Sequence, residues 1–206
     1  MLHLGTNLFS DSSKTCFLIP ARGGSKGIIN KNLKKINGIT LVGLAINFAL
    51  KFVKCENVFL SSDSEKILKC GMSKNISTIK RPKYLSHSRV SDIDLILKTL
   101  KIILKKNFNL KYLVYLQPTS PIRYEIQLRK ALNLIKTRNY NSIWSISKID
   151  KKFHPLKLLN RKEDGTIKLY SDQGKQIIAR QQLGDNYIRN GVFYIFNIKK
   201  ILKHKS

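Results

Sequence analysis

The sequence predicts an α/β protein in which a mixed, mainly parallel sheet lies between two layers of helices. Short apolar segments alternate with helical patterns from residue 16 to residue 146, as is typical of strand-helix-strand units with right-handed crossovers. Glycine, proline or polar turn residues follow most of the apolar segments. The chain has 206 residues, of which 42% are hydrophobic, which is enough for one well-packed core.

Six apolar segments read as buried strands. They cover residues 16–19, 57–61, 76–79, 112–116, 142–146 and 192–196. Apolar residues at helical spacing predict helices between them, at 41–52, after residue 64, at 91–105 and around 128–135, with a last helix at 197–204. Because the carboxyl ends of parallel strands meet at one edge of a sheet, we expect ligand-binding residues there.

The chain is predicted to form one domain over residues 15–206, with two additions. Residues 1–14 lack periodicity and read as an N-terminal extension, whereas residues 150–186 are polar and turn-rich and are expected to leave the sheet as an excursion. No stretch approaches the ~18 apolar residues of a membrane span. No signal-peptide pattern precedes the first strand, so a soluble, cytoplasmic protein is expected.

The composition is strongly basic, with 39 Lys and Arg against 12 Asp and Glu and a net charge of +27. Such an excess attracts anions of any kind. The basic residues are spread along the chain, and neither an RNA-binding signature nor zinc-finger spacing accompanies them, so nucleic acid is not the expected partner. Cys16, Cys55 and Cys70 form no Cys-x-x-Cys pair, which argues against a disulfide framework or a zinc site.

A glycine-rich loop follows the first predicted strand. Residues 20–32 read Pro-Ala-Arg-Gly-Gly-Ser-Lys-Gly-Ile-Ile-Asn-Lys-Asn. Its glycines permit a close backbone approach to a ligand, and its basic and hydroxyl side chains add donors. The spacing matches neither a Walker A loop nor a dinucleotide-binding fingerprint. The residues alone leave two interpretations, a cradle for a polyphosphate or an ordinary glycine-rich turn.

Six motifs, in order along the chain, resemble those of the acylneuraminate cytidylyltransferases. They lie at residues 19–32, 61–63, 80–82, 116–123 and 154–157, and at 180–182 leading to 190–191. The resemblance implies a three-layer, nucleotide-diphosphosugar-transferase-like (Rossmann-like) fold. It implies transfer of CMP from CTP to a nine-carbon sugar acid of the sialic type, as in lipopolysaccharide or capsule biosynthesis, with Mg²⁺ as cofactor. It also implies a homodimer in which residues 150–186 reach the partner subunit.

The resemblance implies a nucleotide site at the glycine loop and the next strand ends. Arg22 and Lys31 are expected to act in catalysis by neutralising charge on the phosphates. Arg81 matches a position beside the cytosine ring, with a surface arginine as the alternative. Ser91 lies near another base-contacting position, but its spacing to Asp94 favours a helix cap. The positions that match nucleotide contacts are Ala21, Arg22, Gly23, Ser25, Lys31, Asn32, Arg81 and Ser91.

The resemblance also implies a site for the sugar acid. Gln117 ends an apolar strand, where a buried amide without a partner is costly, so it requires a ligand or a backbone partner. Lys157 is implied to reach across a dimer interface, and His154 reads as an orienting or packing residue rather than a general base. Thr119 and Ser120 have the alternative role of shaping a proline turn. The matching positions are Gln117, Thr119, Ser120, Lys157, Arg180 and Asn190.

The sequence differs from the family in its acidic residues. Asp63 follows a strand and is interpreted as part of a helix-capping motif in preference to a ligand-binding residue. The Asp-x-Asp pair that holds Mg²⁺ in the family has no counterpart, because no Asp or Glu follows Val192. We therefore expect that the C-terminal part of the family domain is missing and turnover is impaired, or that Asp63 substitutes as a ligand. No metal ligand is assigned.

Two other functions stay open at this point. One is a cytidylyltransferase for another acidic sugar, such as 3-deoxy-manno-octulosonate, although the opening loop of that subfamily differs from residues 23–27. The other is a catalytically impaired homologue that binds CTP or an anionic partner through its basic surface. Binding that depends on surface charge is steeply sensitive to salt, which separates it from CTP held in a crevice.

Overall fold

The computed structural model describes residues 12–24, 27–87 and 89–204. Most of the predicted extension 1–14 lies outside these residues, and its end forms a single 3₁₀ turn, Ser12–Lys14. The chain divides into two compact units, one made of Met1–Trp144 and Gly191–Ser206, the other of Ser145–Asn190. None of the described helices has the length and apolar character needed to cross a membrane.

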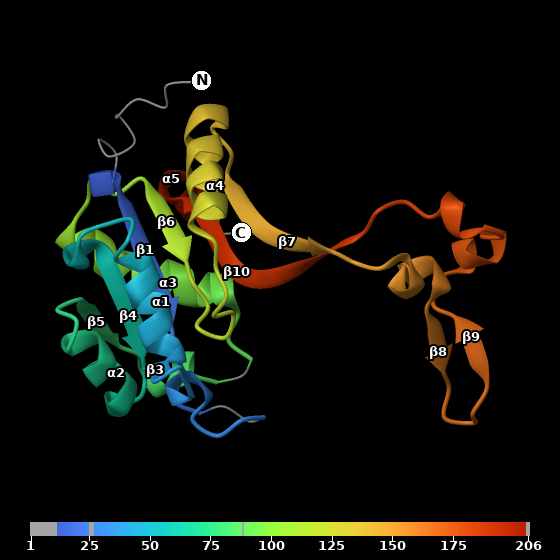
Figure 1. Cartoon of the computed structure of the whole chain (residues 1–206), viewed down its shortest axis with the longest axis horizontal. Coiled ribbons are helices and arrows are strands. Elements are labelled where there is room, and N and C mark those ends of the chain that lie inside the picture. The colour runs from blue at the N-terminus through green and yellow to red at the C-terminus, as the bar shows by residue number, and fades with distance from the viewer. Residues whose placement is uncertain (1–11, 25–26, 88, 205–206) are drawn as a thin grey trace. The chain divides into compact units, whose positions relative to one another are not determined.

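The first unit is built on a six-stranded sheet with the order β5-β4-β1-β6-β10-β7 (Figure 1). Four neighbouring strands, β5, β4, β1 and β6, run parallel, and β10 runs antiparallel to β6. This confirms the mixed, mainly parallel sheet. Its strands are β1 Thr15–Pro20, β4 Val58–Ser62, β5 Ser77–Lys80, β6 Tyr112–Tyr115, β7 Ser142–Lys148 and β10 Tyr187–Asn197.

Helices cover both faces of this sheet, as the alternation of side chains along β1 requires. Phe17 and Ile19 pack into one core cluster, with α1 and α4, whereas Cys16 and Leu18 pack into the other, with α3 and α5. The three-layer fold is thereby confirmed. The helices are α1 Leu41–Ala49, α2 Glu65–Met72, α3 Asp92–Lys106, α4 Glu125–Arg138 and α5 Ile198–His204.

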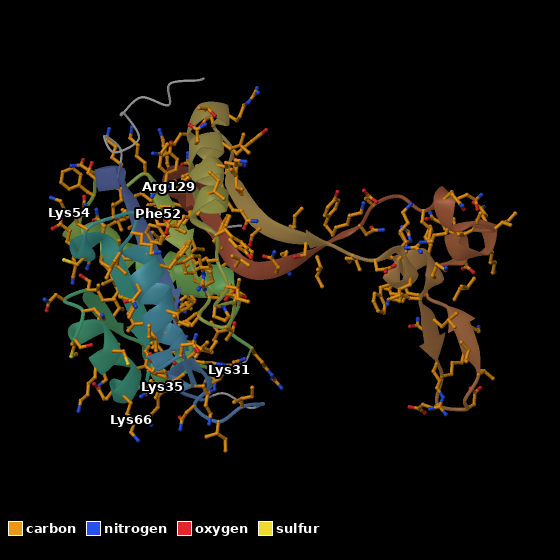
Figure 2. The ribbon with its side chains drawn as sticks, in the orientation of Figure 1. Lys31, Lys35, Phe52, Lys54, Lys66 and Arg129 are labelled. Atoms are coloured by element: carbon orange, nitrogen blue, oxygen red, sulfur yellow. The ribbon has the colours of Figure 1, made fainter. Side chains whose placement is uncertain are left out.

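Aromatic packing joins α1 to the sheet. The ring of Phe52, just after α1, lies 5.8 Å from that of Phe17 and 5.3 Å from that of Phe48. On the outside, the guanidinium of Arg129 from α4 lies 4.8 Å from the Phe52 ring centre (Figure 2). Exposed lysines such as Lys35 and Lys54 lie on different elements, which agrees with the dispersed basic charge predicted for the chain.

A short hairpin between the glycine loop and α1 was not predicted. β2 (Lys35–Ile36) pairs antiparallel with β3 (Ile39–Thr40) through Asn37 and Gly38, both with positive φ. Asn-Gly is a strong sequence signal for this kind of turn. The hairpin leads directly into α1, where the Oγ1 of Thr40 accepts a hydrogen bond from the backbone N–H of Gly43 at 3.0 Å.

The second unit contains a two-stranded sheet and several 3₁₀ turns. β8 (Leu159–Arg161) pairs antiparallel with β9 (Ile167–Leu169), and Gly165 supplies the positive φ of the connecting turn. His154 is buried, and its Nδ1 accepts a hydrogen bond from the N–H of Leu156 at 3.1 Å, which agrees with the predicted orienting or packing role. The unit includes all of residues 150–186, which the sequence marks as an excursion.

Candidate active site

The carboxyl ends of four strands in the first unit meet at one edge of the sheet. Backbone hydrogen bonds fix the residue that leaves β1, β5 and β6, so these three loops start from defined points. The donors and acceptors are Ala21 N to Ser61 O at 2.9 Å, Arg81 N to Ser62 O at 2.7 Å, and Leu116 N to Leu18 O at 2.9 Å.

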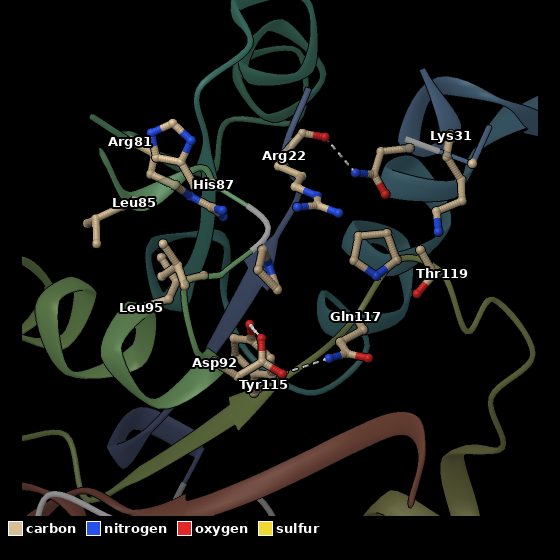
Figure 3. Close-up of a pocket in the computed structure, with 15 residues that line it drawn as sticks. Arg22, Lys31, Arg81, Leu85, His87, Asp92, Leu95, Tyr115, Gln117 and Thr119 are labelled. Carbon is tan, nitrogen blue, oxygen red and sulfur yellow. Dashed lines mark hydrogen bonds between the residues drawn. The ribbon is translucent and has the colours of Figure 1, made fainter. Parts of the chain in front are cut away.

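A cavity of about 390 Å³ opens between these loops and the start of α3 (Figure 3). This volume suits a small-molecule ligand. The cationic side chains of Arg22 and Lys31, from the glycine loop, and of Arg81, from the loop after β5, line the same cavity. Six residues predicted from the sequence are among its lining: Arg22, Lys31, Asn32, Arg81, Gln117 and Thr119.

Asn32 carries a buried acceptor without a partner. Its side chain is 5% exposed, and its Nδ2 donates to the backbone oxygen of Arg22 at 2.9 Å, which holds the two ends of the glycine loop together. Its Oδ1 is also buried, and it has no hydrogen-bond partner among the described residues. A buried carbonyl oxygen of this kind requires a donor, which a ligand in the cavity can provide.

Asp63 holds the glycine loop from the neighbouring strand end. Its Oδ1 accepts a hydrogen bond from the backbone N–H of Gly23 at 2.8 Å. The N-cap of α2 is Ser64, which makes no capping hydrogen bond with its side chain. The prediction that Asp63 belongs to a helix-capping motif was therefore wrong. A Cβ at Gly23 would lie 2.9 Å from that of Ser64, so only glycine fits this approach.

Arg81 is buried at the floor of the site. It is 7% exposed, and its Nη2 donates to the backbone oxygen of Ser61 at 2.9 Å. The alternative of a surface arginine was therefore wrong. Burial lowers the pKa of the guanidinium, while Tyr115 and Asp63 oppose this shift. A buried cation that lines a cavity is well placed to bind an electron-rich group of a ligand.

Asp92 and Tyr115 are site residues that the sequence did not reveal. The Tyr115 hydroxyl donates to Oδ1 of Asp92 at 2.7 Å, and Nε2 of Gln117 donates to Oδ2 at 3.1 Å. Burial, together with the Asp92 carboxylate, raises the pKa of Tyr115 well above its ordinary value, so the hydroxyl keeps its proton. Gln117 thus has the partner that its position requires. From the sequence, residue 92 was assigned only to the start of a helix.

Other predicted residues of the first unit lie beside the cavity. Ser91 caps α3, since its Oγ accepts from the N–H of Asp94 at 3.1 Å, which confirms the preferred interpretation. Ala21 is fully buried, and Ser120 is half-buried. Ser25 lies outside the described residues.

The remaining predicted residues belong to the second unit: Lys157, Arg180 and Asn190. Lys157 and Arg180 are exposed, and Nη2 of Arg180 lies 3.3 Å from Oδ1 of Asp150. Asn190 is half-buried, and its Oδ1 accepts a hydrogen bond from Oγ of Ser145 at 2.6 Å. These contacts are all within the unit, so Arg180 and Asn190 have local partners, and their role in binding stays a prediction.

Side chains that commonly bind metal ions are not clustered in the part of the chain that the structure describes. Over 12–24, 27–87 and 89–204, no three His, Cys, Asp or Glu side chains are grouped as ligands of an ion. Asp63 and Asp92 each accept hydrogen bonds from the protein. Because Mg²⁺ is commonly held by one or two carboxylates together with substrate phosphates, the expected cofactor stays a prediction, and no chemical step is assigned to it.

Comparisons with known proteins agree with this geometry. The N-acylneuraminate cytidylyltransferase of Streptococcus agalactiae serotype V is 29% identical over 198 residues, which cover 94% of this chain and 46% of that protein. The enzyme of the same name from Escherichia coli O18:K1:H7 is 27% identical over 194 residues, with 94% and 44% covered. The chain thus spans less than half the length of these curated relatives.

A solved structure shares the fold. A CMP:2-keto-3-deoxy-manno-octonic acid synthetase complexed with CTP superimposes with a TM-score of 0.67 and 16% identity, covering 93% of this chain and 77% of the other. At this identity the likeness shows the nucleotide-diphosphosugar-transferase-like fold. The family model described as cytidylyltransferase matches residues 16–200, nearly the whole chain. The chain therefore belongs to the cytidylyltransferase family.

Proposed function

We propose that this chain binds CTP in the cavity and transfers CMP to a sialic-type nonulosonic acid, with release of pyrophosphate. The observation that carries the proposal is the composition of the cavity, where three cations and one buried, unpartnered acceptor face the same space. Family membership and the names of the relatives support it. The Mg²⁺ requirement expected from the resemblance, and a place in the cytoplasm beside CTP, are parts of the proposal.

The cations suit the triphosphate. Phosphate oxygens only accept hydrogen bonds, and Arg22 and Lys31 only donate. When a sugar hydroxyl attacks the α-phosphate in line, negative charge builds on the phosphate oxygens and on the leaving pyrophosphate. Fixed cations at the carboxyl ends of the strands stabilise this charge and hold the reacting atoms in line.

The remaining polar groups suit a cytidine nucleoside. Oδ1 of Asn32 cannot receive a phosphate oxygen, because both are acceptors, but it can accept a hydrogen bond from a ribose hydroxyl. Arg81 can donate to O2 and N3 of cytosine. Uracil carries an N–H donor at the same ring position, which would face the guanidinium, so UTP should bind more weakly than CTP.

Gln117 and Thr119, in the first unit, are proposed to contact the sugar acid bound to their own subunit. Lys157 and Arg180, in the second unit, are proposed to contact the sugar acid bound to the partner subunit of a homodimer. Exposed apolar side chains in the second unit support an interface between copies of the chain. Ile178 is 93% exposed and Tyr170 is 61% exposed. Sedimentation velocity tests this part directly, and a monomer at all accessible concentrations contradicts it.

Calorimetric titration with four nucleotides tests the nucleotide site. Wild type and Asn32→Ala are titrated with CTP, UTP, 2′-deoxy-CTP and 3′-deoxy-CTP at two salt concentrations. We expect wild type to prefer CTP over UTP by at least about tenfold. One of the two deoxynucleotides should bind wild type about tenfold more weakly than CTP does. The same deoxynucleotide and CTP should bind Asn32→Ala with equal affinity, as a double-mutant cycle requires. Equal affinity for CTP and UTP, with steep loss in salt, indicates non-specific anion binding instead.

Pyrophosphate release tests turnover. The chain is supplied with CTP, Mg²⁺ and either N-acetylneuraminate or 3-deoxy-manno-octulosonate, with EDTA as the matched control. Release with the nine-carbon acid alone supports the proposed substrate, and release with the eight-carbon acid alone replaces it. CTP binding without release from either acid leaves a nucleotide-binding homologue, which overturns the proposed reaction.

A further inference from the structure

Asp92 is unexpected in a site for anionic ligands. It is the one carboxylate among the described residues that line the cavity, where it lies with three cations. It is exposed to solvent in the free chain, so it is not there to fill the core. A negative charge here repels a triphosphate and a sugar acid alike, and this cost requires a compensating role.

Asp92 accepts a hydrogen bond from Tyr115 with one carboxylate oxygen and from Gln117 with the other. The hydroxyl of Tyr115, a residue only 1% exposed, donates to its Oδ1 at 2.7 Å, and the Tyr115 ring stacks on that of Tyr194 with centroids 6.4 Å apart. The other carboxylate oxygen of Asp92, Oδ2, accepts a hydrogen bond from Nε2 of Gln117 at 3.1 Å. The backbone oxygen of Gln117 is also fixed, because Nη2 of Arg123 donates to it at 2.5 Å.

A carboxylate determines which end of an amide faces it. Because ionised Asp92 only accepts hydrogen bonds, the NH₂ group of Gln117 must face it, and a flipped amide would place two oxygens against each other. Figure 3 shows the result, with Nε2 of Gln117 directed to Asp92 and Oε1 directed away. Oε1 has no hydrogen-bond partner among the described residues.

We propose that Asp92 is a positioning residue for specificity, which holds the Gln117 amide so that its carbonyl oxygen is presented to the sugar acid. The group that Gln117 binds is then a hydrogen-bond donor, either a hydroxyl or the N–H of an acylamino group, and not the carboxylate of the sugar. The inference rests on the proposed function for the identity of the ligand. The orientation of the amide does not depend on it.

Asp92→Asn reverses this orientation. The new amide at position 92 keeps an oxygen for the Tyr115 hydroxyl and turns its NH₂ toward Gln117. Gln117 then flips and presents a donor to the ligand. Asp94→Asn is the matched control, because it removes the same charge from the same turn of α3. The Asp94 side chain contacts Ser91 and does not line the cavity.

NMR of the free chain tests the orientation directly. The side-chain NH₂ signals of Gln117 are assigned by their absence in Gln117→Glu. In wild type we expect one proton shifted downfield and protected from exchange by the carboxylate. This shift should be lost in Asp92→Asn and kept in Asp94→Asn. Unchanged Gln117 signals in Asp92→Asn overturn the inference, whatever the ligand is.

Binding of N-acetylneuraminate to the CTP-saturated chain in EDTA tests the consequence without turnover. We expect Asp92→Asn to bind the sugar acid at least about tenfold more weakly and to bind CTP at least as well as wild type. The double variant Asp92→Asn/Gln117→Glu presents an oxygen again and should recover most of the loss. Equal sugar-acid affinity in wild type and Asp92→Asn refutes the inference. Failure of wild type to bind CTP instead refutes the proposed function.

Discussion

A side chain at Gly191 would collide with the amide of Gln117. A Cβ atom at position 191 would lie 2.6 Å from Oε1 of Gln117 and 3.2 Å from Oγ of Ser120. The backbone of Gly191 has a φ of +70°, which L residues rarely adopt. Strand β10 and the turn after β6 therefore fit together only because this position carries no side chain.

Gly191→Ala should damage both stability and ligand binding. The positive φ and the collision should lower the free energy of unfolding by about 1–3 kcal/mol. Displacement of Gln117 should weaken binding of the sugar acid more than that of CTP. Urea unfolding and titration measure the two effects. Gly184→Ala is the control, because nothing lies within 4 Å of its Cβ. Equal behaviour of the two variants contradicts the packing described.

Asp63→Ala should loosen the glycine loop. The carboxylate receives the N–H of Gly23 across 40 residues of sequence, and a hydrogen bond to a charged group contributes roughly 1.5–3 kcal/mol. We expect destabilisation of about that size, with CTP binding weakened by about tenfold because the loop loses its preorganisation. Calorimetry and chemical unfolding provide the measurement. Asp172→Ala, whose side chain is 91% exposed, should change neither quantity.

Arg123→Lys should lower the free energy of unfolding, although the substitution keeps the positive charge. The guanidinium donates to Val192 O at 3.2 Å and to Gln117 O at 2.5 Å, and burial lowers the pKa of Arg123 to about 10. An ammonium cannot span both carbonyl oxygens, so one is left unpaired, at about 1–3 kcal/mol. Arg129→Lys on the surface of α4 should remain within about 0.5 kcal/mol of wild type. Thermal and urea unfolding compare the two variants.

Glu125 should contribute to stability only above acidic pH. A hydrogen bond from Lys51, at 2.7 Å, lowers the pKa of this carboxyl below 4.5. Because the folded pKa lies below the unfolded one, the contribution is present above pH ~4.5 and is lost as the pH falls through the folded pKa. Wild type should therefore lose more stability than Glu125→Gln between pH 5 and 3. The midpoints of urea unfolding at the two pH values measure this difference. The pair is exposed, so salt should reduce the difference.

The parts of the fold that depend on local pattern were predictable. Apolar segments and turn residues located the parallel strands, and strand ends located Arg22, Asn32 and Gln117 at one edge. β10 was predicted too short, because its first residues are exposed and are strand only through pairing with β7. Pairing partners are a tertiary property that hydrophobicity does not record.

The acidic residues show why the site was predicted only in part. A carboxylate after a strand can cap a helix or receive a distant N–H, and the local sequence is the same in both cases. Only the approach of Gly23 decides the role of Asp63. In the same way, Asp92 lies one residue after a correctly identified cap, but its partners Tyr115 and Gln117 lie on another element.

The second unit begins inside β7 and ends inside β10, and these two strands are neighbours in the six-stranded sheet. The chain therefore leaves and re-enters the sheet at adjacent points, as it would through an ordinary turn. Lengthening such a connection adds little closure entropy, because the cost grows only with the logarithm of its length. The insertion can thus be shortened, exchanged or elaborated in evolution while the strand order that builds the cavity is preserved.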